Sequence, residues 1–215
     1  MLTRARVSQL TAEFLGTGLL VMMALVLSQT TAVSYFIATS VAVALAVAYM
    51  VFGPVSGGHF NPAITVGLWA VRRIKTLPGV SYVAAQLLGG AAAWQLFEYL
   101  TGRAVDARGG TLDTKVFVAE VVGTFLLAMG FAAAVSRSLT ALESALTYAA
   151  SLFVGVMVAA MASAAYINPA VALGLQDFKW HYVAGPLVGG ILGVGLYYVL
   201  FAPAKVALRL PRLRR

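Results

Sequence analysis

Long apolar runs alternate with short polar stretches along the whole chain. Six runs are about twenty residues long, which at 1.5 Å per residue matches a helix crossing a hydrocarbon core ~30 Å thick. They are Leu10–Leu27, Val33–Phe52, Val80–Leu100, Val116–Val135, Ser144–Ser163 and Tyr182–Phe201. Runs of this length and polarity predict an all-helical integral membrane protein with six transmembrane helices.

The basic residues indicate the orientation of these helices. An even number of spans places both termini on one side, and eleven of the fifteen Lys and Arg residues fall on that side. The four on the opposite side are Arg103, Arg108, Lys115 and Lys179. The positive-inside rule therefore predicts a multi-pass protein with both termini cytoplasmic, and we expect a prokaryotic cell (inner) membrane.

Composition removes several classes of function. Of 215 residues 61% are hydrophobic and 10% charged, and a water-soluble protein of this size could not bury so much apolar surface. The chain has no cysteine and two histidines, so thiol chemistry and a histidine-rich metal centre are excluded, and we expect no metal or cofactor. The net charge of +8 includes a basic tail, Arg209–Arg215, which we interpret as a membrane anchor and not as a nucleic-acid site.

An internal repeat organises the chain. Residues 12–22 match residues 119–129 at seven of eleven positions with an offset of 107, and Asn-Pro-Ala at Asn61 recurs at Asn168 with the same offset. Each copy contains three spans, so the second copy must enter the membrane from the opposite face. We therefore expect one domain, 1–215, built from inverted repeats 1–106 and 107–215.

Each Asn-Pro-Ala motif has the signature of a helix start, with Asn as N-cap and Pro in the first turn. The first predicted helix, from Pro62 to about Arg72, would be ~15 Å long, which is half the membrane. Two such half-helices entering from opposite faces would meet at their N-termini. The preceding loops must then line a watery path with their carbonyls, because irregular backbone at that depth needs polar partners. The predicted carbonyls belong to Gly57, Gly58, His59, Phe60, Ala164, Ala165, Tyr166 and Ile167.

At this point the sequence resembles the aquaporins, or major intrinsic proteins. The resemblance covers nearly the whole chain and rests on Ser56–Ala63, on Asn168-Pro169-Ala170, and on Glu13 and Glu120 in the repeated first helices. It implies six transmembrane helices, two re-entrant half-helices, a homotetramer in the lipid bilayer, and a pore motif in each subunit. That motif is Asn61, Pro62, Ala63, Asn168, Pro169 and Ala170.

The two asparagines would donate hydrogen bonds to a permeating molecule, and the two half-helices would aim their positive ends at the same point and repel cations. Glu13 and Glu120 are intramembrane carboxylates, for which a proton relay is one interpretation. We favour support of the re-entrant loops, since each carboxylate could accept N–H groups of a loop that lacks partners. We expect His59 to brace the first loop and His181 to be a solvated residue at the membrane interface.

The sequence departs from the family at the constriction. Most members carry an arginine directly after the second Asn-Pro-Ala, but here Val171 stands there. Distance from the asparagines places Val41, Val156 and Ala165 at the other three selectivity-filter positions. Four small apolar groups would make a wider opening that selects by size and by the cost of desolvating charge.

We therefore expect a passive channel, not an enzyme, for water and small uncharged solutes that excludes protons and ions. Candidate solutes are glycerol, urea, ammonia and metalloid hydroxides such as arsenous acid; Ala172, where glycerol facilitators usually carry aspartate, does not favour glycerol specifically. The alternative is a coupled secondary transporter of a small neutral solute, since inverted repeats and broken helices also occur there. A membrane-embedded enzyme would require a nucleophile with its base or a metal cluster, and no such set of residues is evident.

Overall fold

The computed structural model describes residues 3–106 and 113–206, and these parts of the chain fold into eight helices. The helices are α1 (Arg4–Thr30), α2 (Ser34–Ser56), α3 (Pro62–Ala70), α4 (Thr76–Thr101), α5 (Thr114–Ser136), α6 (Ala141–Ala159), α7 (Pro169–Gly174) and α8 (Trp180–Leu200). The prediction of an all-helical membrane protein with six long helices and two half-helices is confirmed.

The long helices have the length and composition of membrane spans. Among the described residues, α1, α2, α5, α6 and α8 are long and apolar enough to cross a bilayer. The sixth long helix, α4, has 26 residues but is less apolar. The predicted spans lay within six residues of these bounds: α1 begins at Arg4 instead of Leu10, whereas α6 ends at Ala159, four residues before the predicted Ser163. The apolar runs did not mark the ends of the helices, which local caps help to fix. Thr140 and Glu143, for example, form a capping box at the start of α6.

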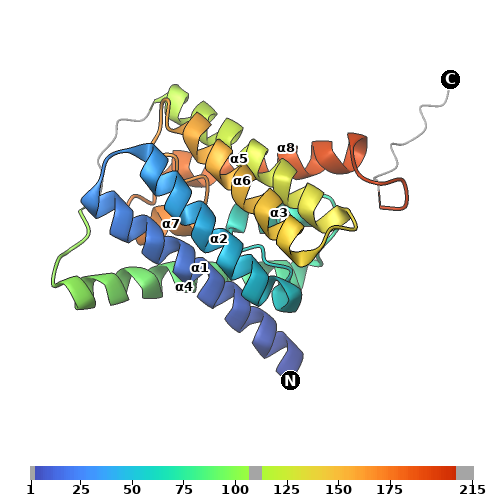
Figure 1. The fold of residues 1–215 in the computed structure, drawn as a ribbon, viewed down its shortest axis with the longest axis horizontal. Helices are drawn as coiled ribbons and strands as arrows, with labels where there is room; N and C mark the ends of the chain where they lie inside the picture. The colour runs from blue at the N-terminus through green and yellow to red at the C-terminus, as the bar shows by residue number, and fades with distance from the viewer. Residues whose placement is uncertain (1–2, 107–112, 207–215) are drawn as a thin grey trace.

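The two short helices lie inside the bundle at opposite ends. Figure 1 shows α3 toward the right-hand end and α7 toward the left-hand end, with the long helices around them. At 1.5 Å per residue, α3 with nine residues is about 14 Å long and α7 with six is about 9 Å long. Neither crosses a bilayer alone. We expected the first half-helix to extend to about Arg72, but it ends at Ala70 and Arg72 adopts left-handed backbone with φ 59°.

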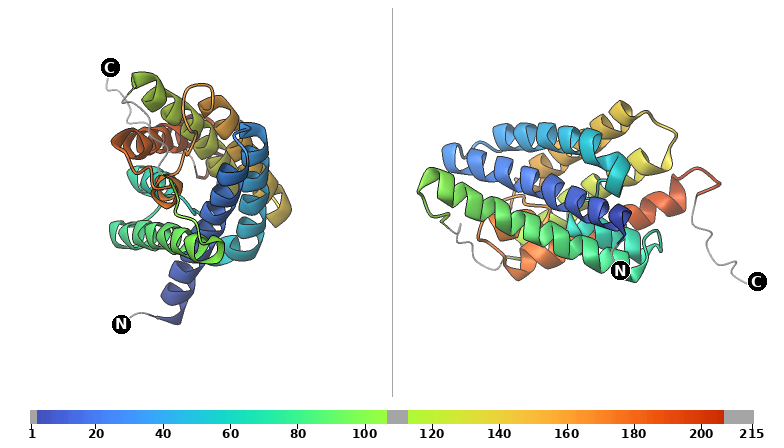
Figure 2. Two further views of the ribbon diagram at one scale, coloured as in Figure 1. Left: turned by 90° about the vertical axis from the view of Figure 1, so that its left-hand side faces the viewer. Right: turned by 90° about the horizontal axis from the view of Figure 1, so that it is seen from below.

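Contacts between helices are paired across the two halves. The helices α1 and α4 pack together as α5 and α8 do, and α1 packs on α2 as α5 packs on α6. Each half-helix packs against the last long helix of the other half, α3 on α8 and α7 on α4. Helices α1 and α5 run in opposite directions, and Figure 2 shows the same arrangement from two further sides.

Glycines set the distance between α5 and α8. A Cβ added at Gly189 would lie 2.3 Å from the carbonyl oxygen of Val121, and one at Gly193 would lie 2.4 Å from that of Phe125. In the other half, a Cβ at Gly89 would lie 2.3 Å from the carbonyl oxygen of Phe14 on α1. The helix backbones approach closely because these positions carry no side chain.

Two predicted features lie partly or wholly outside the described residues. The start of the second repeat, at residue 107, lies outside them with residues 107–112, and so does the basic tail Arg209–Arg215 that we interpreted as an anchor.

Adding a single methyl group at the close contact between α5 and α8 should destabilise the fold. We expect Gly189→Ala to lower the free energy of unfolding by about 1 to 3 kcal/mol, because the methyl meets a backbone oxygen that cannot rotate away. Gly195→Ala on the same helix is the matched control, since its Cβ would meet one atom, Val71 Cγ1, at 4.0 Å. The measurement is the thermal unfolding midpoint in detergent micelles, and equal midpoints for the two variants would contradict this account of the packing.

Candidate functional site

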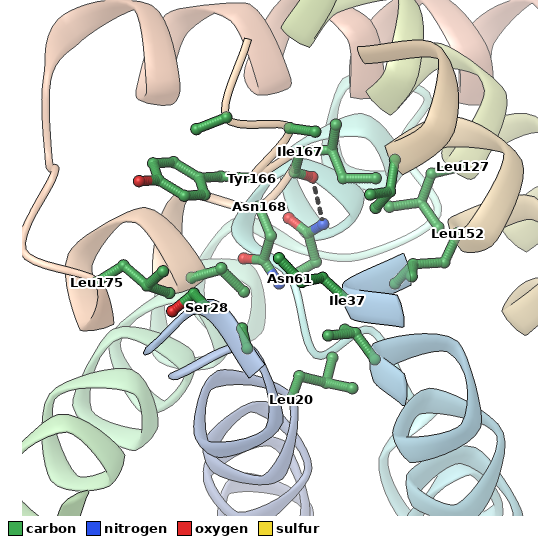
Figure 3. Close-up of a pocket in the computed structure, with 16 residues that line it drawn as sticks. Leu20, Ser28, Ile37, Asn61, Leu127, Leu152, Tyr166, Ile167, Asn168 and Leu175 are labelled. Carbon is green, nitrogen blue, oxygen red and sulfur yellow. Dashed lines mark hydrogen bonds between the residues drawn. The ribbon is translucent and has the colours of Figure 1, made fainter. Parts of the chain in front are cut away.

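The N-termini of the two half-helices meet at Asn61 and Asn168. Each asparagine caps its own helix: Asn61 Oδ1 accepts from the Ala63 N–H at 2.8 Å, and Asn168 Oδ1 accepts from the Ala170 N–H at 3.0 Å. Each side-chain amide then reaches the opposite loop. Asn61 Nδ2 donates to the Ile167 carbonyl at 2.9 Å, drawn as the dashed line in Figure 3, and Asn168 Nδ2 donates to the Phe60 carbonyl at 3.0 Å.

This arrangement fixes the direction of the remaining amide hydrogens. A side-chain amide carries two N–H donors, and one from each asparagine is used in the crossing bond. The oxygen is held by the cap, so the amide cannot turn. Figure 3 shows both asparagine side chains at the border of one cavity. The N-cap role and a donor role toward the cavity are therefore compatible in the same residue.

Glu13 holds the loop before Asn61. This buried carboxylate on α1 accepts from the backbone N–H of His59 at 3.0 Å and of Phe60 at 2.7 Å. Ser56 Oγ–H donates to it at 2.6 Å, and Gln86 Nε2 on α4 donates at 2.7 Å. Four donors from three segments converge on one carboxylate, which satisfies backbone groups that have no helical partner.

Glu120 on α5 does the same for the loop before Asn168. It accepts from the backbone N–H of Tyr166 at 3.0 Å and of Ile167 at 2.7 Å, and from the hydroxyl of Ser163. The partners are the repeat equivalents of His59, Phe60 and Ser56. The equivalent of Gln86, however, is Pro186, which has no side-chain donor, so Glu120 has no counterpart of the bond that Gln86 gives to Glu13.

Both loops use left-handed backbone at equivalent positions. The φ angles are 49° at Phe60 and 43° at Ile167, and 67° at Gly58 and 57° at Ala165. For a residue with a side chain this conformation costs about 1 to 3 kcal/mol and persists only when surrounding contacts enforce it. The carboxylate on the N–H and the asparagine on the carbonyl supply those contacts at Phe60 and Ile167.

One cavity brings the predicted filter residues together with the asparagines. It has a volume of about 570 Å³, including space open to the outside. The residues that line it are Leu20, Ala24, Ser28, Ile37, Val41, Asn61, Leu127, Leu152, Val156, Ala164, Ala165, Tyr166, Ile167, Asn168, Val171 and Leu175. Val41, Val156, Ala165 and Val171 come from α2, α6, the second loop and α7, and they are 6% to 8% exposed. The cavity wall is largely aliphatic.

The second loop lines this cavity and the first does not. Residues 164–167 are all in the lining, whereas Gly57, Gly58, His59 and Phe60 are not. The His59 carbonyl accepts from Tyr148 Oη–H at 2.8 Å, and His59 Nδ1 lies 3.0 Å from Thr65 Oγ1. His59 is therefore held from both its backbone and its ring.

Sequence reasoning missed several residues that hold the two loops. Gln86 joins Glu13 to Thr65, Tyr148 holds the His59 carbonyl, and Asp177 accepts from Tyr166 Oη–H at 3.3 Å while pairing with Lys179 at 2.7 Å. The role of Gln86 could have been suspected from the sequence, because Gln86 is a polar residue in a repeated apolar segment and its equivalent in the other copy is Pro186. Asp177 follows a half-helix, and no sequence pattern indicated its contact with the second loop.

The expectation for His181 was wrong. We expected a solvated histidine, but His181 is 1% exposed and packs against the Tyr182 ring at a centroid distance of 4.3 Å. Its position near the predicted membrane interface suggested a solvated side chain, yet its ring lies between the rings of Trp180 and Tyr182, at centroid distances of 5.8 Å and 4.3 Å. Burial here depends on a tertiary contact that helix periodicity does not report.

Replacing the carboxylate of Glu13 should release the first loop. In Glu13→Gln one acceptor oxygen becomes an NH₂ donor that faces other donors, so we expect the free energy of unfolding to fall by about 1 to 3 kcal/mol. Glu143→Gln is the matched control, because glutamine preserves the surface capping box. Thermal unfolding and water permeability in proteoliposomes give the readout; a Glu13→Gln protein as stable and permeable as the control would refute the supporting role.

Comparison with known proteins identifies the family to which this chain belongs. The family model described as Major intrinsic protein matches residues 2–198. Aquaporin-5 of Rattus norvegicus is 33% identical over 219 residues, covering 92% of this chain and 82% of the relative. Aquaporin TIP2-3 of Zea mays is 37% identical, covering 74% and 71%, and Aquaporin Z of Photorhabdus laumondii is 30% identical, covering 78% and 84%.

A solved structure has the same fold. The aquaglyceroporin from Plasmodium falciparum superposes with a TM-score of 0.76, covering 89% of this chain and 95% of the other at 20% identity. The family model spans nearly the whole chain, and the relatives exceed or equal 30% identity over most of their length. The chain therefore belongs to the major intrinsic protein family, the aquaporins, which are membrane channels and not enzymes.

Proposed function

We propose that Val41, Val156, Ala165 and Val171 form an apolar selectivity filter in a pore whose centre is Asn61 and Asn168. As a member of its family, the chain is a passive channel for water and small uncharged solutes. The observation that carries the filter proposal is that all four residues line one cavity with both asparagines, although they come from four separate segments.

Selection at this filter would act by size and by desolvation. Val171 occupies the first turn after Pro169-Ala170, where a charged side chain would project into the cavity. Aliphatic groups donate no hydrogen bonds, so a permeating molecule keeps its contacts with its neighbours and with the loop backbone. Neutral solutes larger than water then pass at a modest cost, whereas ions lose hydration without compensation. The solutes that we propose are glycerol, urea, ammonia and metalloid hydroxides.

Exclusion of cations would arise at the asparagines. Each half-helix carries partial positive charge at its N-terminus, and the two N-termini face each other. The free amide hydrogens would turn the oxygen of a permeating water toward themselves. Water molecules on either side would then point in opposite directions, which interrupts a proton-conducting chain.

We also propose that the two halves, 1–106 and 107–215, act as inverted repeats in one domain, that both termini are cytoplasmic, and that four copies assemble. The paired helix contacts support the first proposal, and the basic residues on the terminal side support the second. Three valines on α2 are 49% to 59% exposed, namely Val43, Val47 and Val51. They offer an apolar face to a neighbouring copy or to lipid. Light scattering of the detergent-solubilised protein would give the number of copies.

A cation at position 171 should narrow the solute range. We expect Val171→Arg to lower the glycerol-to-water permeability ratio by about tenfold, the factor given by about 1.4 kcal/mol of added barrier. Stopped-flow light scattering on proteoliposomes measures both permeabilities. Val171→Met is the control for length without charge. If Arg and Met lower the ratio equally, size alone acts; an unchanged ratio in Val171→Arg would place the filter elsewhere.

A negative charge at the centre should open the channel to protons. Asn168→Asp keeps the capping oxygen but removes the amide donors and adds charge between the two positive helix ends. We expect proton flux into vesicles loaded with a pH-sensitive dye to rise by about tenfold or more. Asn168→Ala removes the donors without adding charge. A leak of equal size in both variants would assign it to disturbed geometry, and no leak in either would contradict the barrier at this point.

A further inference from the structure

An apolar groove runs along the outside of the bundle between α3 and α4. Its walls are Thr65, Val66, Trp69, Thr76, Gly79, Val80 and Val83, and it measures about 630 Å³ including open space. Trp69 is 49% exposed and Val80 is 63% exposed. The groove starts at the inner part of the half-helix and follows it outward to its C-terminal end. We call it the α3–α4 groove.

The α3–α4 groove opens into a basic hollow at the end of α3. This hollow is lined by Trp69, Ala70, Arg72, Ile74, Lys75 and Thr76, and measures about 860 Å³ including open space. Trp69 and Thr76 line both the groove and the hollow. Trp69 Nε1–H donates to Thr76 Oγ1 at 3.0 Å where the two meet. In the described parts of the chain neither Arg72 nor Lys75 pairs with a carboxylate. An apolar slot at membrane depth thus ends at two exposed, unpaired cations.

We propose that this combined surface binds one anionic phospholipid, with an acyl chain in the α3–α4 groove and the phosphate on Arg72 and Lys75. The aliphatic wall suits a hydrocarbon chain, and a tryptophan at the junction suits the level of the headgroups. The cations lie on the side that carries the termini and most of the basic residues, where the positive-inside rule places the cytoplasmic leaflet with its anionic lipids.

Charge on the rest of the molecule favours lipid over a second copy of this chain. The chain has seven acidic residues. Glu13, Glu120 and Asp177 are buried; Glu98, Asp106 and Asp113 lie at the ends of α4 and α5 on the other side of the membrane. On the side of Arg72 and Lys75 this leaves Glu143, whose carboxylate caps α6. Another copy would therefore cover these cations without neutralising them, whereas a phosphate neutralises them.

The test compares lipid retention on the whole protein by native mass spectrometry in detergent. Phosphatidylglycerol and phosphatidylcholine with the same acyl chains are the probes. We expect the protein to prefer the anionic lipid, and Arg72→Gln/Lys75→Gln to weaken phosphatidylglycerol binding by roughly twenty-five-fold, at about fivefold per basic side chain. Arg4→Gln/Arg6→Gln, which removes two exposed cations of α1 on the same side, should leave it unchanged.

A second variant tests the groove itself. A Cβ at Gly79 would meet one atom, Ile74 Cγ2, at an ordinary 3.7 Å, so the first carbon of a leucine side chain fits there without a backbone clash and the rest would occupy the groove that Gly79 lines. We expect it to weaken both lipids while the unfolding midpoint in detergent is kept. Equal losses in the two double glutamine variants, or full binding in Gly79→Leu, would overturn the proposal. A change in the number of copies in Gly79→Leu, without loss of lipid, would assign the groove to a second copy instead.

Discussion

The structure depends on a buried carboxylate that accepts hydrogen bonds from an irregular loop in the middle of a membrane protein. Two loops carry the chain to the half-helices, and their N–H groups lie where water and lipid give no regular partner. Glu13 and Glu120 take these N–H groups, two from each loop, together with a serine hydroxyl. A charge in a dry interior is costly when isolated, and the converging donors offset that cost. The same contacts fix the left-handed residues that turn each loop toward the centre.

This anchoring makes a rigid centre next to an adaptable outer opening. At the centre, each asparagine is held by a cap on one side and by a carbonyl of the opposite loop on the other. Each half of the chain therefore orients the amide of the other. The cavity wall also contains aliphatic side chains from separate segments, such as Val41, Val156 and Val171, which have no hydrogen-bonding groups. If these side chains form the filter that we propose, their size and polarity can change without disturbing the hydrogen bonds that hold the loops.

The two halves are equivalent in their anchors and different around them. In the first half, Gln86 links Glu13 to Thr65, and Thr65 lies beside His59. In the second half, proline replaces the glutamine, Ala172 replaces the threonine, and Tyr166 is held from outside by Asp177. Beyond the two carboxylates, the first loop is thus braced by the Gln86–Thr65 network and the second by the buried bond between Tyr166 and Asp177. It is the second loop that lines the cavity together with the four residues that we propose as the filter.

The sequence by itself determined the features that are encoded locally or by repetition. Apolar runs of membrane length, Asn-Pro helix starts, and the offset of 107 between Glu13 and Glu120 and between Asn61 and Asn168 were enough to predict the helices and the two half-helices. Only the tertiary structure decided which groups meet. The crossing bonds of the asparagines and the contacts of Gln86 and Asp177 join residues from separate segments, and the burial of His181 depends on how α8 packs in the bundle. Such contacts depend on how helices pack in three dimensions, whereas periodicity and caps report each segment alone.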